Sequence, residues 1–108
     1  MLPKKNRADK KAVEKVFKGG RFLNSSYFTF KFILTNNPTV PRISFIASKK
    51  ITKLAVKRNL LKRRGYVALK KYIHKFPAGL VGVFVFKKHQ DDVSIIEDEI
   101  KSILNKIS

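Results

Sequence analysis

The sequence has no cysteine, few acidic residues and no long apolar run. The absence of cysteine excludes disulfide bonds, zinc sites with cysteine ligands and thiol catalysis. No apolar stretch approaches the roughly 20 residues that a membrane-spanning helix needs. The charged start, MLPKKNR, is not followed by the apolar segment of a secretory signal. Together these absences predict a cytoplasmic protein.

Positive charge is in large excess. The chain of 108 residues has 25 lysines and arginines against seven acids, a formal net charge of +18. Residues 1–90 carry 23 of these cations and only two acids, whereas residues 91–108 carry the other five acids. A compact chain with this charge repels itself, and a bound polyanion would relieve the repulsion. Nucleic acid is the commonest such partner, and an anionic membrane surface is the rival.

Catalytic side chains are scarce. The two histidines, His74 and His89, lie in different predicted elements and have no carboxylate close in sequence. Acid–base and metal sites need convergent groups, and no nucleophile–base motif, phosphate-binding loop or carboxylate pair is present. The acids of the last segment resemble an exposed helix face. We therefore expect no catalytic residue and no protein-bound metal in this chain.

The length predicts a single domain over residues 1–108, with residues 1–8 extended and flexible. A first helix is expected to begin at Asp9, whose carboxylate can cap free backbone N–H groups. Gly19 and Gly20 are expected to end this helix, with glycine in the left-handed conformation.

Period-two alternation predicts a strand over residues 27–34, with phenylalanines on one face. The turn-forming residues 36–39, NNPT, lead to a second strand over 43–48, and an antiparallel hairpin is the simplest pairing. The wholly apolar run at 80–86 predicts a strand covered on both faces.

Two more helices complete the expected fold. The first spans residues 53–75, with Gly65 packed closely against the sheet; its apolar arc contains Leu54, Leu61, Ala68, Leu69, Tyr72 and Phe76. Asp91 and Asp92 cap the second, which follows them. The resulting order, α-β-β-(short strand or loop)-α-β-α, predicts an α+β fold, a two-layer α/β sandwich.

A basic stripe runs along the helix expected over residues 53–75. Five residues at helical spacing form it and two more flank it: Asn59, Lys62, Arg63, Tyr66 and Lys70, with Lys57 and Arg58 beside them. An ordinary solvated face is the plain alternative. The stripe, however, has no glutamates to form i,i+4 pairs, so its charges repel one another unless a polyanion is bound. Arginine suits phosphate, while the asparagine amide and the tyrosine ring suit bases, so the stripe predicts an RNA-binding surface.

Two smaller groups are candidates for the same partner. Lys49 and Lys50 follow the second predicted strand and can hold phosphates. The outward face of the first strand carries Tyr27, Thr29 and Lys31, which with Phe17 of the first helix can stack and hold single-stranded RNA. Phe17 is equally compatible with a place in the core.

Three runs of sequence, NRADKKAVEKVFKGG, RISFIASKKI and AVKRNLLKRR, resemble the protein subunit of bacterial ribonuclease P. The resemblance covers about residues 6–86. It implies an α-β-β-β-α-β-α fold like the second domain of ribosomal protein S5, with a left-handed βαβ crossover. It also implies a subunit that binds a catalytic RNA and the 5′ leader of precursor tRNA, while the RNA with Mg²⁺ removes the leader.

The resemblance also implies roles for individual residues. Arg58, Asn59, Lys62 and Arg63 match the motif that faces the catalytic RNA; Lys49 and Lys50 match the strand-end lysines, and Phe17 matches an aromatic at the leader cleft. Leu60 and Tyr66 stand where the family usually has arginine, and Val13 and Lys31 stand where it often has an aromatic. We therefore expect a leader cleft with fewer aromatic residues than the family pattern.

Two other functions remain open from the residues alone. A ribosomal or general RNA-binding protein without a cleavage role would have the same composition. A DNA-binding protein with a helix in the major groove ranks lower, because the basic helix is expected to be half buried against a sheet.

Overall fold

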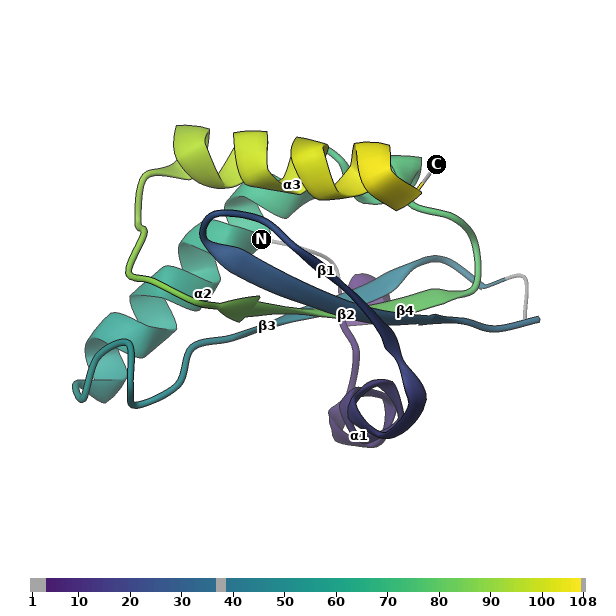
Figure 1. Ribbon diagram of the computed structural model, residues 1–108, viewed down its shortest axis with the longest axis horizontal. Helices are drawn as coiled ribbons and strands as arrows, with labels where there is room; N and C mark the ends of the chain where they lie inside the picture. The colour runs from purple at the N-terminus through teal and green to yellow at the C-terminus, as the bar shows by residue number, and fades with distance from the viewer. Residues whose placement is uncertain (1–3, 37–38, 108) are drawn as a thin grey trace.

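The computed structural model of the chain describes residues 4–36 and 39–107. Its elements are the 3₁₀ turn η1 (Lys4–Asn6), α1 (Lys10–Gly19), β1 (Arg21–Asn24), β2 (Phe28–Leu34), β3 (Arg42–Ile46), α2 (Ala55–Lys70), the 3₁₀ turn η2 (Ile73–Lys75), β4 (Leu80–Phe86) and α3 (Val93–Ile107) (Figure 1). This order confirms the predicted α+β class.

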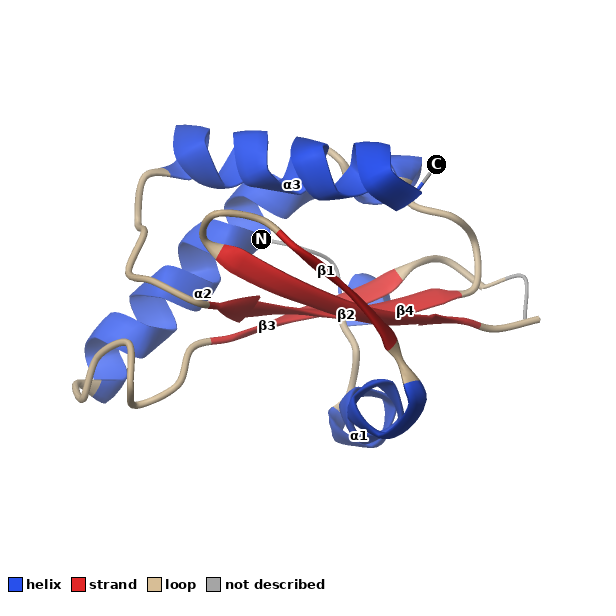
Figure 2. Ribbon diagram, viewed as in Figure 1, coloured by secondary structure: helices blue, strands red, loops and turns tan. Residues whose placement is uncertain are grey.

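The four strands form one mixed sheet in the order β1-β2-β4-β3. β2 pairs antiparallel with both β1 and β4, whereas β3 pairs in parallel with β4. α2 and α3 cover one face of the sheet, and α1 lies on the other (Figure 2).

The predicted hairpin between residues 27–34 and 43–48 is wrong. β4 lies between these two strands, because its apolar side chains are buried on both faces and so require a central position. The hairpin is formed by β1 and β2 instead, so the short extra strand precedes the phenylalanine-rich strand. Of the turn predicted at 36–39, residues 37 and 38 lie outside the described residues.

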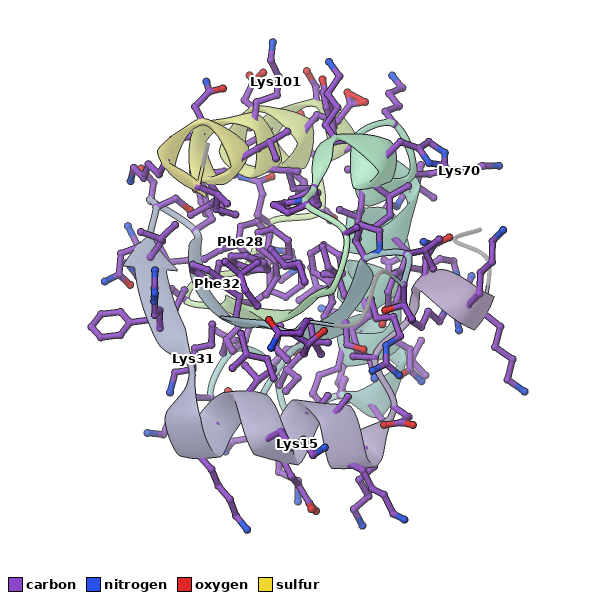
Figure 3. All side chains as sticks on the ribbon, turned by 90° about the vertical axis from the view of Figure 1, so that its right-hand side faces the viewer. Lys15, Phe28, Lys31, Phe32, Lys70 and Lys101 are labelled. Atoms are coloured by element: carbon purple, nitrogen blue, oxygen red, sulfur yellow. The ribbon has the colours of Figure 1, made fainter. Side chains whose placement is uncertain are left out.

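The main core lies between the sheet and the helices α2 and α3. Phe28, Phe30 and Phe32 of β2 belong to this core, as the alternation predicts. Figure 3 shows Phe28 and Phe32 on the side of the sheet that α2 and α3 cover. The ring of Phe84 in β4 joins this cluster, with its centroid 4.3 Å from that of Phe30 and 5.1 Å from that of Phe45. A smaller core under α1 contains Ala12, Val16, Val81 and Val83. β4 therefore contributes to both cores, which confirms its double coverage.

The ends of α1 agree only partly with expectation. The backbone N–H of Ala12 donates to Asp9 Oδ1 at 2.8 Å, which confirms the predicted cap. Gly20, however, has φ −79°, so the left-handed ending is wrong. Glycine is needed there for close approach, since a Cβ would overlap the carbonyl oxygen of Val16.

The helix predicted over 53–75 is shorter and ends differently. Leu54 is 58% exposed and precedes α2, so its predicted inward position is wrong. After Lys70 the chain forms η2, whose three-residue period places the buried Ile73 and Phe76 on one side. Gly65 does pack closely against the sheet, because an added Cβ would lie 2.7 Å from the Phe45 ring.

The N-terminal segment is folded against β3. Residues 4–6 form η1 rather than the predicted extended chain, and residues 1–3 lie outside the described residues. The side-chain amide of Asn6 donates a hydrogen bond of 3.0 Å to the carbonyl oxygen of Pro41. The hydroxyl of Ser44 donates one of 2.7 Å to the carbonyl oxygen of Ala8. These contacts cover the outer edge of β3, an edge strand of the sheet.

The acids of α3 are not simply an exposed face. Asp92 caps the helix as predicted, since Ser94 N donates to Asp92 Oδ1 at 2.9 Å. Glu97 Oε1 lies 2.8 Å from Lys71 Nζ, and this hydrogen-bonded carboxylate raises the pKa of Lys71. Glu99 Oε1 accepts a hydrogen bond of 2.6 Å from the backbone N–H of Tyr27. Two of these acids therefore join α3 to α2 and to the β1–β2 hairpin.

The Glu99 contact predicts a measurable loss of stability. Glu99→Ala should lower the free energy of unfolding by about 1.5–3 kcal/mol, because the half-buried N–H of Tyr27 loses a charged acceptor. Glu99→Gln keeps an acceptor oxygen and should lose less. Urea unfolding of both variants measures the difference, and equal losses would contradict the role of the hydrogen bond.

Candidate nucleic-acid interface

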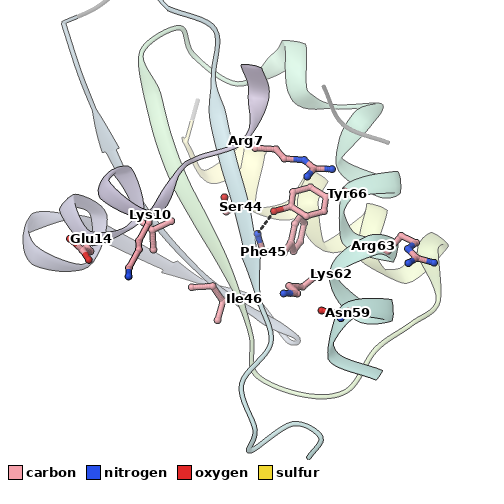
Figure 4. Close-up of a pocket in the computed structure, with 11 residues that line it drawn as sticks. Arg7, Lys10, Glu14, Ser44, Phe45, Ile46, Asn59, Lys62, Arg63 and Tyr66 are labelled. Atoms are coloured by element: carbon pink, nitrogen blue, oxygen red, sulfur yellow. Dashed lines mark hydrogen bonds between the residues drawn. The ribbon is translucent and has the colours of Figure 1, made fainter. Parts of the chain in front are cut away.

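A cleft of about 700 Å³ opens between α1, β3 and α2 (Figure 4). It is lined by Arg7, Lys10, Val13 and Glu14 from the N-terminal part, Ser44, Phe45 and Ile46 from β3, and Asn59, Lys62, Arg63 and Tyr66 from α2. Three segments far apart in the sequence thus meet at one concave surface.

Most of the predicted basic stripe lies along one wall of the cleft. Asn59, Lys62 and Arg63 lie within about one helical turn of each other on α2 and line the cleft. Lys62 points toward β3, whereas the Arg63 guanidinium lies at the outer rim and points away from β3 (Figure 4). Lys57 and Lys70, also predicted for RNA contact, are exposed on α2 but do not line the cleft.

The opposite wall was not predicted as a site. Arg7 precedes α1 and Lys10 lies in its first turn, so neither belongs to the periodic pattern that identified the stripe. The only sequence signal for them is the generally basic N-terminus. Glu14 is the one acid among the lining residues, against four cations. A row of phosphates would compensate this excess charge.

Tyr66 is a structural part of the cleft wall. Its hydroxyl accepts a hydrogen bond of 3.2 Å from Phe45 N, an amide on the free edge of β3 (Figure 4). The Arg7 guanidinium lies 4.8 Å from the centroid of the Tyr66 ring. Tyr66 therefore fixes α2 to β3 and holds Arg7 over the cleft, and its predicted RNA contact is untested.

Arg58 also has an intramolecular role. Its Nη1 donates to the carbonyl oxygens of Thr52 and Lys53, at 3.0 and 2.9 Å. The guanidinium thus fixes the loop between β3 and α2, and Arg58 does not line the cleft. This loop also contains the exposed Lys49 and Lys50, so Arg58 helps to determine where those lysines lie.

The residues predicted for the leader do not all lie together. Lys31 Nζ is 4.8 Å from the centroid of the Phe17 ring, on the face of the sheet that carries α1, and Phe17 is 44% exposed rather than core. The hydroxyl of Thr29, on the same face of β2, donates a hydrogen bond to Asn24 Oδ1. Tyr27 packs against the main core instead, because β2 begins only at Phe28 and the alternation does not extend to it.

The described residues provide no assembly typical of a metal site. Among residues 4–36 and 39–107, no three His, Cys, Asp or Glu side chains gather closely enough to hold an ion. No helix in that part of the chain is long and apolar enough to cross a membrane.

The chain is similar in sequence to known proteins. The family model for Ribonuclease P matches residues 2–108. The "Ribonuclease P protein component" of Pseudanabaena sp. is 30% identical over 109 residues, which cover 98% of this chain and 94% of that protein.

Solved structures have the same fold. The RNase P protein from Thermotoga maritima superposes with a TM-score of 0.80 at 21% identity, covering 94% of this chain and 97% of that chain. The Staphylococcus aureus RNase P protein gives a TM-score of 0.77 at 18% identity, covering 95% of both chains. By its sequence match over nearly the whole length, the chain belongs to the bacterial ribonuclease P protein family.

Proposed function

We propose that this RNase P protein component binds the catalytic RNA and the 5′ leader of precursor tRNA. It thereby assists the Mg²⁺-dependent endonucleolytic cut that gives the mature 5′ end of tRNA. The observation that carries the proposal is the cleft between α1, β3 and α2, in which Lys62 points toward β3, Arg7 lies over the Tyr66 ring, and Lys10 and Arg63 lie at the rims (Figure 4).

The chemistry of the cleft suits a place where two RNA strands approach each other. Arginine forks bind phosphate oxygens in pairs, and lysine adds a compact positive charge. Each phosphate that they neutralise releases counterions and removes repulsion between leader and catalytic RNA. The complex then needs less Mg²⁺ to form. In this proposal the RNA holds most of the Mg²⁺ and carries out the reaction, and the chain acts in the cytoplasm without a catalytic side chain.

The leader would leave the cleft across the sheet. Phe17 and Lys31 provide an exposed ring and a cation on the α1 face, a combination suited to unpaired bases and their phosphates. Lys49 and Lys50, exposed in the loop that follows β3, would contact a nearby phosphate.

Recovery of crosslinked RNA from cells tests the proposal against the general RNA-binding alternative. The expected result is enrichment of RNase P RNA and of tRNA precursors that still carry leaders. Ribosomal RNA as the sole crosslinked species would contradict the proposal and favour a ribosomal role.

A further inference from the structure

Phe22 in β1 is unusually exposed for a phenylalanine of this chain. It is 61% exposed and Phe17 is 44% exposed, whereas the other seven phenylalanines, all within the described residues, are buried. Val13 and Lys31 are not aromatic, so the exposed rings of the α1 side of the sheet come from Phe17 and Phe22.

The strand register places Phe22 beside the leader residues. Phe22 pairs with Lys31 across the antiparallel β1–β2 ladder, and cross-strand partners project to the same face with their Cβ atoms about 5 Å apart. Figure 3 shows Lys31 on the side of the sheet that carries α1. The Lys31 ammonium group also lies 4.8 Å from the Phe17 ring. Lys31 is therefore a neighbour of both exposed rings.

A strip of sheet connects this group to the cleft. The register aligns Asn24, Thr29, Val85 and Ile46 in one row across all four strands, on the same face as Lys31. Thr29, Val85 and Ile46 are only half buried, and Ile46 lines the cleft. Three strand spacings make the row about 14 Å wide, enough for an extended chain to cross from the cleft to the β1 edge.

Charge determines what kind of chain fits this strip. No acidic residue occurs between Glu14 and Asp91, so the whole sheet and α2 are free of negative side chains. The exposed Lys18 follows Phe17, and Lys31 lies beside Phe22 across the β1–β2 ladder. Exposed rings interleaved with cations suit single-stranded nucleic acid, whose bases stack on the rings while its phosphates contact the cations.

We propose that Phe22 is a base-stacking residue for single-stranded RNA, which extends the leader path from the cleft across the sheet to the edge at β1. The inference rests on the proposed function and adds to it a residue that determines how much of the leader is bound. The substrate class is a precursor tRNA whose leader is long enough to reach β1.

Binding by the reconstituted holoenzyme tests this role. The substrates are precursor tRNA with a long leader, the same tRNA with a leader too short to cross the sheet, and mature tRNA. Phe22→Ala should weaken binding of the long-leader substrate about five- to tenfold, the lower part of the range for loss of one base–aromatic stack. Affinity for the other two substrates should be unchanged.

Further variants separate stacking from other roles of Phe22. Phe22→Trp should retain the affinity, whereas Phe22→Leu, which is apolar but has no π face, should lose as much as Phe22→Ala. Leu34→Ala removes a side chain of similar exposure, 54%, from the far end of β2 and should change nothing. If Phe22→Leu bound the long-leader substrate with wild-type affinity, the inference would be overturned. An equal loss of affinity for mature tRNA in Phe22→Ala would overturn it too.

The same experiment distinguishes failure of the inference from failure of the proposed function. If the wild-type protein favours precursor over mature tRNA but Phe22→Ala binds the long leader as tightly, the inference alone is wrong. If the wild-type protein does not distinguish the two, the leader-binding function itself is contradicted.

Discussion

Arg63→Ala is expected to weaken binding to RNase P RNA about tenfold without loss of thermal stability. Arg63 is exposed on α2 at the rim of the cleft, where its guanidinium points toward solvent and is open to a phosphate (Figure 4). Loss of one phosphate contact should reduce the slope of log K against log salt by about 0.7–0.9. Removal of a like charge from this cationic surface relieves repulsion, so the melting temperature should not fall. Arg64→Ala is the matched control, since Arg64 is exposed on the same helix outside the cleft, and an equal loss there would contradict the assignment.

Arg58→Ala should behave differently, although sequence alone predicts the same effect for both arginines. The substitution removes the hydrogen bonds to the carbonyl oxygens of Thr52 and Lys53 and should lower the free energy of unfolding by about 1–3 kcal/mol. Under conditions where the variant is fully folded, the salt dependence of RNA binding should stay close to that of the wild type. Urea unfolding and a salt titration measure the two quantities. Normal stability with a reduced slope would show that Arg58 contacts phosphate instead.

Gly82→Ala is expected to destabilise the protein by about 3 kcal/mol, because it overfills a closely packed core. Gly82 lies in the central strand β4, and an added Cβ would lie within 2.6 Å of the Phe30 ring. That ring cannot move away easily, since its centroid is 4.3 Å from that of Phe84 and 5.4 Å from that of Phe32. For a domain of this size the melting temperature should fall by more than about 10 °C.

Gly19→Ala is the matched control for this prediction. Gly19 ends α1, has no positive φ, and an added Cβ would meet no atom within 4 Å. The substitution should be neutral or stabilise the protein by up to about 1 kcal/mol, because alanine favours the helix. Equal melting temperatures for the two variants would contradict the close packing of Phe30 on β4.

Local patterns in the sequence predict the elements better than their assembly. The cap at Asp9, the phenylalanine alternation of β2 and the apolar run of β4 each depend on neighbouring residues, and the structure confirms all three. Strand order depends on contacts between distant segments, so the turn-like NNPT led to a hairpin that β4 in fact interrupts. The sequence predicts the short extra strand after residues 43–48 and not at β1, because the four residues of β1 are too few to show an alternation.

Some residues of the candidate site can likewise be predicted from local patterns, and others cannot. Asn59, Lys62 and Arg63 were predicted because helical spacing alone aligns them, and they do line one wall of the cleft. Arg7 and Lys10 reach the other wall through the path of the chain across β3, which no periodicity encodes. The bonds of Arg58 to the preceding loop depend on the backbone geometry of that loop, so the sequence gives no sign of them.

Cleavage of precursor tRNA at low Mg²⁺ tests the central claim most directly. A bacterial RNase P RNA is assayed alone, with the wild-type protein, and with a Lys62→Ala, Arg63→Ala double variant. The proposed function predicts that the wild-type protein restores cleavage at the mature 5′ end at Mg²⁺ concentrations where the RNA alone is inactive. The double variant should need more Mg²⁺ than the wild type to do so. Cleavage by the RNA that is unaffected by the wild-type protein at every Mg²⁺ concentration would contradict the claim.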